Sequence, residues 1–510
     1  MNSKQIIRNE NLEAEIVIIG GGGAGMAAGL AAAENGCKNI ILLEKAGIGG
    51  NSAMAHDVFG AESPVQRRMG VDARRDDFFK IAMRWAHWSK INPRIVRVFI
   101  DKSGDTIRWL QEKGLSFELG QYYINQAPRV MHTIKGEGEE LMRVLTGKCR
   151  ELGIQVLTRT PAVKIFRGEK GNVTGVLATT KDKEFIITTK TVVITTGGYA
   201  ENQAFLKKCP YYNPDTMLNH GVRSNTGDGI RMATEIGAAT AGLGHIMFHG
   251  PSAPASASSR MKIGDPGSDV KEYPVSILIR EPETLWVNKR GKRFIDEGHN
   301  LASFASATTV AQQPDGIMYT IFDDTIRQSM EKDGINWPGA YGGQIRENPR
   351  HRRPLAGVPL PGLGRELRAQ AEKSNVLKIA DSLNEIANYI GSKPEALEAT
   401  VKEYNTGCDN GHDAVFCKDR RYLLPIRSAP FYAIRGQAFI CDAIGGIKIN
   451  EHMEVLDYED NPIPGLYAAG STTGCWESEN YCYELTGHLL GFALNSGRIA
   501  GENAAKYVSR

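Results

Sequence analysis

The clearest hydrophobic pattern lies near the N-terminus, where two apolar runs flank a segment rich in glycine and alanine. Residues 16–19 form a β-branched run that ends in the glycine cluster of residues 20–25, and such a run is typical of a buried strand. An alanine-rich helical stretch follows, and Gly36 is its expected C′ residue. Residues 39–44 form a second apolar run that ends in a glutamate. This order predicts a β-α-β unit that opens a doubly wound sheet.

The apolar spacing changes along the rest of the chain. Between about residues 75 and 153 apolar positions recur every three or four residues, which predicts helices. From residue 154 to 194 the period shortens to that of strands. The segment 246–436 then mixes short strands, proline-rich loops and helices, with the helices expected near residues 376–405. The chain after this segment returns to glycine-rich strand, loop and helix. This change predicts an inserted domain over 246–436 within a first domain built from residues 1–245 and 437–510.

Composition excludes several classes of protein. The 510 residues carry 61 lysines and arginines against 58 acids, and the net charge of +3 is unlike the basic balance of a nucleic-acid binder. Glycine is high at 56 residues, and without a collagen repeat this excess is typical of loops that approach a ligand. The eight cysteines lack the spacing of a zinc, haem or iron–sulfur site. We therefore expect reduced thiols and a cytoplasmic protein.

One stretch reaches the length of a membrane span. Residues 16–33 are 18 residues without a charge. The stretch contains six glycines and has no basic flank, whereas a signal peptide needs positive charge ahead of its apolar core. We interpret it as the buried strand and helix described above, and expect neither a membrane span nor an export signal.

The glycine cluster carries the strongest chemical signal. Gly20, Gly22 and Gly25 form a G-x-G-x-x-G pattern between the predicted strand and helix, and Glu44 ends the next strand. In a dinucleotide-binding turn the first glycine permits the tight bend, the second lets backbone approach a pyrophosphate, and the third permits close helix–strand packing. The helix N-terminus stabilises phosphate charge, and the acid accepts from ribose hydroxyls. The pattern predicts FAD or NAD, because a carboxylate at this place disfavours the extra phosphate of NADP.

Further motifs decide between these two cofactors. Together with the glycine cluster they resemble the FAD-dependent oxidoreductase 2 family, which includes fumarate reductase and succinate dehydrogenase flavin subunits, 3-ketosteroid dehydrogenases and urocanate-reductase-like enzymes. The resemblance implies FAD, and an α/β fold with a Rossmann-like FAD-binding domain (1–245 and 437–510) and an inserted α+β capping domain (246–436). The matching segments run nearly end to end, at residues 44–45, 49–52, 195–198, 226–229, 287–294, 464–470 and 496–501.

The resemblance also implies which residues contact the cofactor. In succinate dehydrogenases a histidine after the diglycine tethers the flavin, whereas Asn51 stands there in this chain, so we expect FAD to be non-covalent. The loop that ends at Ser52 is expected to contact the pyrophosphate and the flavin. The backbone at Val163 is expected to face the adenine. The implied cofactor-binding residues are Gly20, Gly22, Gly25, Glu44, Lys45, Gly50, Asn51, Ser52, Val163, Thr196, Gly197, Asp228, Gly470, Ser471, Leu489 and Leu490.

Departures from the family pattern bear on the substrate. Fumarate reductases carry a proton-donating arginine at the position of Leu301, and a histidine where this chain has Cys441 or Asp442. Their C-terminal substrate arginine is also missing, because residues 467–497 contain no arginine. Two carboxylates of a dicarboxylate need such cations. We therefore expect that neither fumarate nor succinate is the substrate.

Three residues are catalytic candidates. Tyr481 resembles the tyrosine of a Tyr-Pro segment in ketosteroid dehydrogenases, with Cys482 in place of the proline; its phenol could bond a substrate carbonyl, or it could simply pack against the flavin. His249 resembles a substrate histidine of the family, or it caps a turn. His56 follows the loop near the flavin N5 and could polarise substrate, or lie at the surface. Weaker candidates are Arg280, His299, Glu484 and Asp442.

These features predict a flavoenzyme acting on the CH–CH or C=C bond of a small conjugated carbonyl or carboxylate, by hydride transfer at flavin N5. The capping domain would close over the flavin and exclude water; the direction of reaction stays open. The sequence has no second nucleotide motif and no haem or iron–sulfur motif, so electrons must pass to or from an external protein, reduced nicotinamide or reduced flavin. Two alternatives remain, an electron-transfer subunit of a larger redox complex and an oxygen-using oxidase or hydroxylase.

Overall fold

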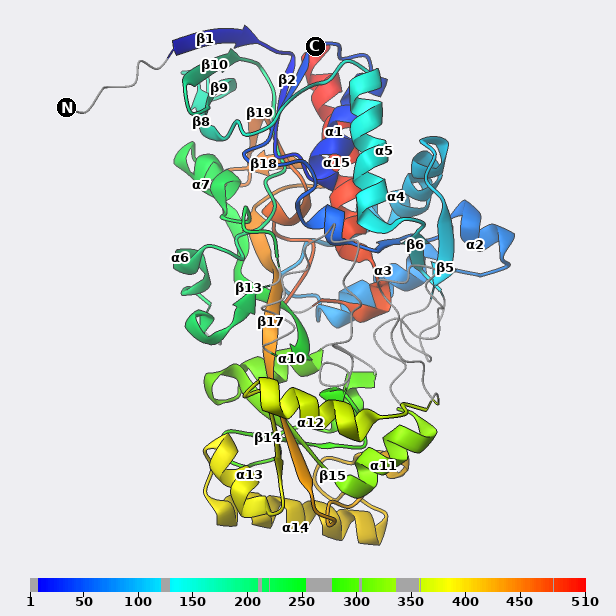
Figure 1. The fold of residues 1–510 in the computed structure, drawn as a ribbon. Helices are drawn as coiled ribbons and strands as arrows, with labels where there is room; N and C mark the ends of the chain where they lie inside the picture. The colour runs from blue at the N-terminus through cyan, green and yellow to red at the C-terminus, as the bar shows by residue number, and fades with distance from the viewer. Residues whose placement is uncertain are drawn as a thin grey trace, which may run out of the picture.

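The upper part of the molecule in Figure 1 is built on a six-stranded sheet. The computed structural model describes residues 8–120, 129–209, 213–219, 221–253, 278–301, 305–335, 357, 359–479 and 481–510. All neighbouring pairs in the sheet are parallel except the edge pair β18–β19. The strands, in spatial order, are β18 (Glu454–Leu456), β19 (Pro462–Ala468), β11 (Val192–Ile194), β2 (Ile16–Ile19), β3 (Ile40–Leu43) and β7 (Gln155–Leu157).

Long helices pack beside this sheet and against one another (Figure 1). They are α1 (Gly23–Glu34), α5 (Glu137–Glu151) and α15 (His488–Val508). The contact between α1 and α15 is very close, because a Cβ added at Gly497 or Gly501 would lie 2.3 or 2.2 Å from a carbonyl oxygen of α1. Strands buried on both faces explain why β2 and β3 are continuous apolar runs.

Smaller elements surround this core. Four strands form a sheet in the order β1 (Arg8–Glu13), β10 (Lys183–Thr188), β9 (Val173–Thr179) and β8 (Ala162–Arg167). Three more strands form a sheet in the order β4 (Asp57–Phe59), β6 (Met131–Ile134) and β5 (Phe117–Gly120). The remaining helices here are α2 (Pro64–Arg68), α3 (Arg75–Trp85), α4 (Pro93–Glu112), α6 (Gln203–Leu206) and α7 (Asp228–Glu235).

The lower part in Figure 1 is a second α/β unit. Its sheet has the order β12 (Leu218–Asn219), β17 (Phe431–Ile447), β15 (Ile317–Asp323) and β14 (Leu285–Asn288), and β13 (Thr240–Ser252) and β16 (Leu377–Ala380) also pair with β17. Its helices are α10 (Ala305–Ala311), α11 (Asp324–Asp333), α12 (Leu363–Lys373), α13 (Leu383–Ile390) and α14 (Pro394–Asn410).

The strand β17 joins the two parts. Its first half pairs with β15 and β16, and its second half pairs with β13, so it runs through the middle of the molecule (Figure 1). The expected domain boundaries at 245/246 and 436/437 fall inside β13 and β17. The two parts therefore share a continuous β-ribbon at these boundaries.

The structure agrees with the predicted β-α-β unit and adds strands elsewhere. Residues 16–33 divide into β2 and α1, and the structure described contains no helix that is long and apolar enough to cross a bilayer. The stretch expected to be helical near 376–405 begins with the strand β16. The hydrophobic pattern also did not predict β1, because this polar edge strand pairs only with β10 among the described strands and contributes little to the core.

Candidate cofactor and substrate site

A cleft opens where four parallel strands end. Its walls follow the carboxyl ends of β2, β3, β11 and β19, the usual place for a ligand in such a sheet. The cleft holds about 830 Å³ of empty space, its open mouth included. Twenty-six residues line it, namely Ile19, Gly20, Gly22, Gly23, Ala24, Leu43, Glu44, Lys45, Gly50, Asn51, Ser52, Pro161, Ala162, Thr195, Thr196, Gly197, Val222, Ser224, Asn225, Asp228, Met232, Asp442, Ala469, Gly470, Ser471 and Ala493.

The three motif glycines meet three different constraints. Gly20 has φ +115°, and a Cβ there would lie 2.3 Å from the Thr195 carbonyl oxygen. At Gly25 a Cβ would lie 1.9 Å from the carbonyl oxygen of Gly20, so the helix packs directly on the turn. At Gly22 a Cβ would meet only the Gly49 oxygen, at 3.8 Å, and would otherwise enter open space beside the cleft. This bare backbone is what a pyrophosphate needs to approach the turn.

The N-terminus of α1 faces the same space. Its N-cap is Gly22, which provides no side-chain cap, and no acid stands in the first turn. The Gly23 N–H donates to Ser52 Oγ at 3.0 Å, which holds the short 3₁₀ helix Gly50–Met54 against the turn. Uncapped amides and the positive end of the helix dipole make this a fitting place for a diphosphate.

Charged side chains lie at the other side of the cleft. Glu44 accepts from the backbone N–H groups of Gly21 and Ala46, each at 2.7 Å. These bonds fix the carboxylate at the end of β3, and its remaining lone pairs can accept from ribose hydroxyls. Lys45 Nζ lies 2.5 Å from Asp228 Oδ2, at the start of α7. This pair connects the end of β3 to α7 and neutralises the charge of Lys45.

A buried polar cluster borders the cleft near its inner end. Asp442 Oδ1 accepts from Asn225 Nδ2 at 3.1 Å and from the Ala443 N–H at 2.9 Å. The side chains of Ser471 and Asn51 also hydrogen-bond to this carboxyl group. Burial raises the pKa of Asp442 to about 6, although these bonds act in the opposite direction. The sequence interpretation counted Asp442 only as a weak catalytic candidate. The available signal was its position, since it stands directly before the diglycine segment at residues 443–446, which lies within β17.

Four of the expected cofactor residues do not line the cleft. Gly25 lies beneath the turn, as described above. Val163 lies on β8 with its side chain 37% exposed, and its carbonyl oxygen accepts from Arg231 Nη2 at 3.2 Å; its neighbour Ala162 lines the cleft instead. Leu489 and Leu490 are the second and third residues of α15, so their amides lie in a helical first turn. The other twelve expected residues come together around the cleft.

Tyr481 lies against the N-terminus of α15. Its hydroxyl oxygen accepts from the N–H of Gly487, the N-cap of this helix, at 3.0 Å. Its ring lies over that of His488, with centroids 4.2 Å apart. Burial raises the pKa of Tyr481 above its ordinary value, and the nearby Asp57 acts in the same direction. The phenol is therefore held in its protonated form at neutral pH.

The other two catalytic candidates lie directly before β4 and on β13. His56 Nδ1 lies 3.3 Å from Glu137 Oε2. The residue directly precedes β4, whose Phe59 N–H donates to the carbonyl of Gly487 at 3.0 Å, so β4 borders the N-terminus of α15. His249 lies on β13, and its backbone pairs with Phe439 on β17; its side chain lies outside the part of the chain that the structure describes.

The weaker candidates lie further out. Arg280 Nε donates to the Pro251 carbonyl at 2.7 Å, and its charge lies near the Cys441 thiol, whose pKa burial raises to about 12. His299 lies in a 3₁₀ helix of the lower unit. Glu484 is exposed and lies 3.8 Å from Arg84. No group of acidic, histidine or cysteine side chains in the described residues has the arrangement of a metal site.

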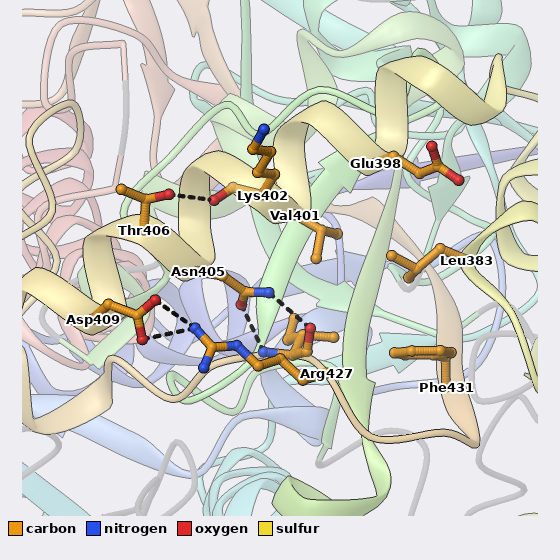
Figure 2. A pocket seen from close by; sticks show the side chains of 10 residues that line it. Leu383, Glu398, Val401, Lys402, Asn405, Thr406, Asp409, Arg427 and Phe431 are labelled. Carbon is orange, nitrogen blue, oxygen red and sulfur yellow. Dashed lines mark hydrogen bonds and ion pairs between the residues drawn. The ribbon is translucent and has the colours of Figure 1, made fainter.

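A second hollow lies on the lower unit, along α14 (Figure 2). It is an open surface depression, and two of its four charged side chains, Arg427 and Asp409, bond to each other. Arg427 Nη2 lies 2.6 and 2.7 Å from the two Asp409 oxygens, and Asn405 bonds the backbone of Ile426. The hollow shares no lining residue with the cleft.

The fold and the cleft define a class of protein, the FAD-dependent oxidoreductases of two-domain architecture. The sequence profile described as "FAD binding domain" matches residues 15–484. The chain belongs to this family. It therefore binds FAD, and the glycine turn, the N-terminus of α1 and Glu44 fit the diphosphate and the adenosine ribose of that dinucleotide.

Individual relatives agree with this assignment. The chain is 29% identical to a vinyl phenol reductase of Lactiplantibacillus plantarum, over 97% of each chain. It is 28% identical to an NADH:fumarate oxidoreductase of Klebsiella pneumoniae, over 96% of this chain but 48% of that protein. Its fold is similar to that of the open conformation of a flavocytochrome c3 fumarate reductase, with a TM-score of 0.70, 26% identity and coverage of 98% and 79%.

Proposed function

We propose that the protein is a reductase of a C=C bond in a small conjugated substrate, with non-covalent FAD and with Tyr481 as the proton donor. The observation that carries the proposal is the hydrogen bond at Tyr481. Because its oxygen accepts the Gly487 N–H, its own proton remains available to a substrate. The similarity to a vinyl phenol reductase over the full length of both chains supports the reductive direction and a conjugated substrate.

Some residues of this chain are proposed to hold the cofactor, and others to protonate the substrate. When bound, and once reduced by the external donor, FAD would supply hydride from N5. The turn at Gly22 and the N-terminus of α1 hold the diphosphate, and Glu44 fixes the adenosine ribose. The N-terminus of α15 orients the phenol of Tyr481 through the Gly487 N–H. Residues 246–436, which form most of the lower unit, are proposed as a cap that excludes water from the reacting bond.

The charges around the cleft argue against a dicarboxylate substrate. Lys45 is the only basic side chain among the residues lining the cleft, and Asp228 already neutralises it. Residues 467–497, which include the Tyr481 loop, contain neither arginine nor lysine. Among the described residues that line the cleft, a fumarate molecule would therefore find no unpaired cation for its two carboxylates.

The remaining assignments follow from what the chain contains. The described residues form one dinucleotide cleft, so electrons come from a separate donor, either a protein or a reduced nicotinamide or flavin. Asn51 donates or accepts hydrogen bonds but cannot form the tether that a histidine provides, which supports non-covalent FAD. We assign the protein to the cytoplasm because its eight cysteines form no disulfide in the structure.

The test is single-turnover reoxidation of the photoreduced enzyme by a panel of vinyl phenols, enones and enoates, with fumarate included. Tyr481→Phe should retain FAD and slow reoxidation by the best substrate about 10²–10³-fold, the usual loss for one such donor. Tyr483→Phe, from the same loop, is the matched control and should react at the unaltered rate. Rapid reoxidation by fumarate, by oxygen or only by a flavodoxin would contradict the proposed substrate class.

A further inference from the structure

His488 lies directly beneath the proposed proton donor. It is the first residue of α15, and only 3% of its surface is exposed. Its ring lies 4.2 Å from that of Tyr481, with the planes inclined by 33°. On its other side Trp476 makes an edge contact at 5.8 Å. The imidazole is therefore enclosed by aromatic rings and takes no part in the cleft described above.

Both nitrogens of this ring face oxygen atoms. Nδ1 lies 3.0 Å from the carbonyl oxygen of Leu485, and Nε2 bonds to Oε2 of Glu477. A carbonyl oxygen can only accept, so Nδ1 carries a hydrogen. The Glu477 carboxylate also accepts the N–H groups of Ser478, at 2.9 Å, and Cys482, at 3.3 Å. A carboxylate with this set of donors acts as an ionised acceptor, so Nε2 carries a hydrogen as well.

A positive charge on His488 needs an opposite charge close by, because it would lie at the N-terminus of α15 and away from water. An imidazolium at a helix N-terminus faces the positive end of the dipole, and burial removes it from water. Glu477, which is 7% exposed, supplies the opposite charge. The other ionisable groups that act on Tyr481 or Cys482 are Asp57 of β4 and Glu484. Arg84 of α3 lies 3.8 Å from Glu484, and both of these side chains are exposed to solvent.

We propose that Glu477 and the Leu485 carbonyl hold His488 as a buried imidazolium, and that this cation positions Tyr481 and stabilises the phenolate it becomes on donating its proton. A positive charge against the face of an aromatic ring is favourable, and more so when it is desolvated. His488 is thus a positioning residue that acts through Tyr481. This inference rests on the proposed function of Tyr481.

The step balances without a further reactant. Hydride from the reduced cofactor, which the external donor supplies with electrons, forms a C–H bond at one carbon of the C=C bond. The π bond of the C=C opens, and its electron pair forms the C–H bond at the other carbon with the proton of Tyr481, whose O–H bond breaks. The electron pair of the O–H bond stays on the phenolate oxygen. That oxygen faces the Gly487 N–H while the imidazolium lies under the ring, until water returns the proton.

The kinetic test compares matched variants of the FAD-loaded enzyme. Glu477→Gln removes the counter-charge at nearly constant shape, and should slow single-turnover reoxidation about 10–100-fold at unchanged FAD content and unchanged substrate affinity. In a Tyr481→Phe background the same substitution should cause no further loss. Glu479→Gln changes an exposed carboxylate of the same loop, one that pairs with Lys90, and should leave the rate unaltered. A loss in Tyr481→Phe but not in Glu477→Gln would overturn this inference and leave the proposed function standing; an unaltered rate in Tyr481→Phe would overturn both.

A spectroscopic test does not depend on activity. In protein labelled with ¹⁵N-histidine, the signals of His488 are identified by their loss in His488→Gln. Both ring nitrogens should show the chemical shifts of protonated nitrogen at pH 7–8, and one of them should change to an unprotonated shift in Glu477→Gln. An unprotonated nitrogen of His488 in the unaltered protein would overturn the proposal, since His488 would then carry no charge.

Discussion

Single glycines show how one atom can decide between folding and binding. The constraint at Gly25 is internal, because an added Cβ would lie 1.9 Å from the Gly20 carbonyl oxygen. The constraint at Gly22 is external, because the same atom would meet nothing within 3.8 Å. Two substitutions of identical chemistry should therefore fail in different ways.

We predict that Gly25→Ala lowers the free energy of unfolding by several kcal/mol, in the range of other severe backbone clashes. Gly22→Ala should fold with nearly unaltered stability and lose most of its affinity for FAD, because the methyl group occupies the approach of the diphosphate. Urea denaturation of FAD-free protein and fluorescence titration with FAD measure the two effects. Equal loss of stability in both variants would contradict this assignment.

Asp442 predicts a dependence of stability on pH. Its pKa in the folded protein, about 6, lies above the ordinary value of 3.8. Below about pH 4 Asp442 is protonated in both the folded and the unfolded protein, so its titration does not change the free energy of unfolding. As the pH rises from 4 to 6 the unfolded chain loses this proton first, so the folded protein loses stability, by about 3 kcal/mol at most, and the loss stays constant above pH 6.

In FAD-free Asp442→Asn this fall should be absent, while the amide oxygen still accepts from Ala443 and Asn225. The measurement is the free energy of unfolding of both proteins at pH 4.5 and 7.5. Relative to the unaltered protein, the variant should have a higher free energy of unfolding at pH 7.5 than at pH 4.5. The same difference at both pH values would show that Asp442 titrates normally.

At the scale of elements, a buried ion cluster joins the strands and helices of the lower unit. Arg293 bonds both oxygens of Glu297, at 3.0 and 2.8 Å, and lies 2.7 Å from Asp413 Oδ2. Lys418 Nζ lies 3.3 Å from Glu297 and donates to the Thr284 carbonyl at 2.8 Å. Glu297 also accepts the Trp286 N–H. The cluster thus connects β14, the loop after it and the segment that follows α14.

Removing one anion leaves these buried cations undercompensated. Glu297→Gln should lower the free energy of unfolding by about 3–5 kcal/mol, as when one partner of a buried pair is removed. Glu398→Gln, on the exposed face of α14 (Figure 2), should change it by less than about 0.5 kcal/mol. Guanidinium unfolding gives both values. Comparable small changes in both variants would mean that water solvates the cluster.

At the scale of the whole molecule, every proposed cofactor contact is non-covalent. The cleft draws on loops from both ends of the chain, so it should disassemble completely when the chain unfolds. Acid precipitation of the yellow protein should therefore release all FAD into the supernatant, as measured by absorbance and mass spectrometry. Yellow colour in the washed pellet would contradict the interpretation of Asn51.

The sequence by itself determined the local features of this protein. The apolar runs of β2 and β3, the glycine turn and Glu44 depend on neighbouring residues and on a sheet buried on both faces, so their pattern predicts the β-α-β unit and the dinucleotide site directly. The resemblance of spaced motifs extended this to FAD and to twelve of the twenty-six residues that line the cleft. The polar strand β1 and the short strand β16 were not predicted from the sequence, because neither carries a distinctive apolar period.

Only the tertiary structure decided which distant side chains meet. Asp442 became a member of the cofactor cleft because β17 brings it to Asn51, Asn225 and Ser471, which are far away in the sequence. His488 and Glu477 form a pair because the Tyr481 loop folds back on the first turn of α15. The pKa values and charges of such groups depend on burial and on partners across the fold, and no local pattern records either.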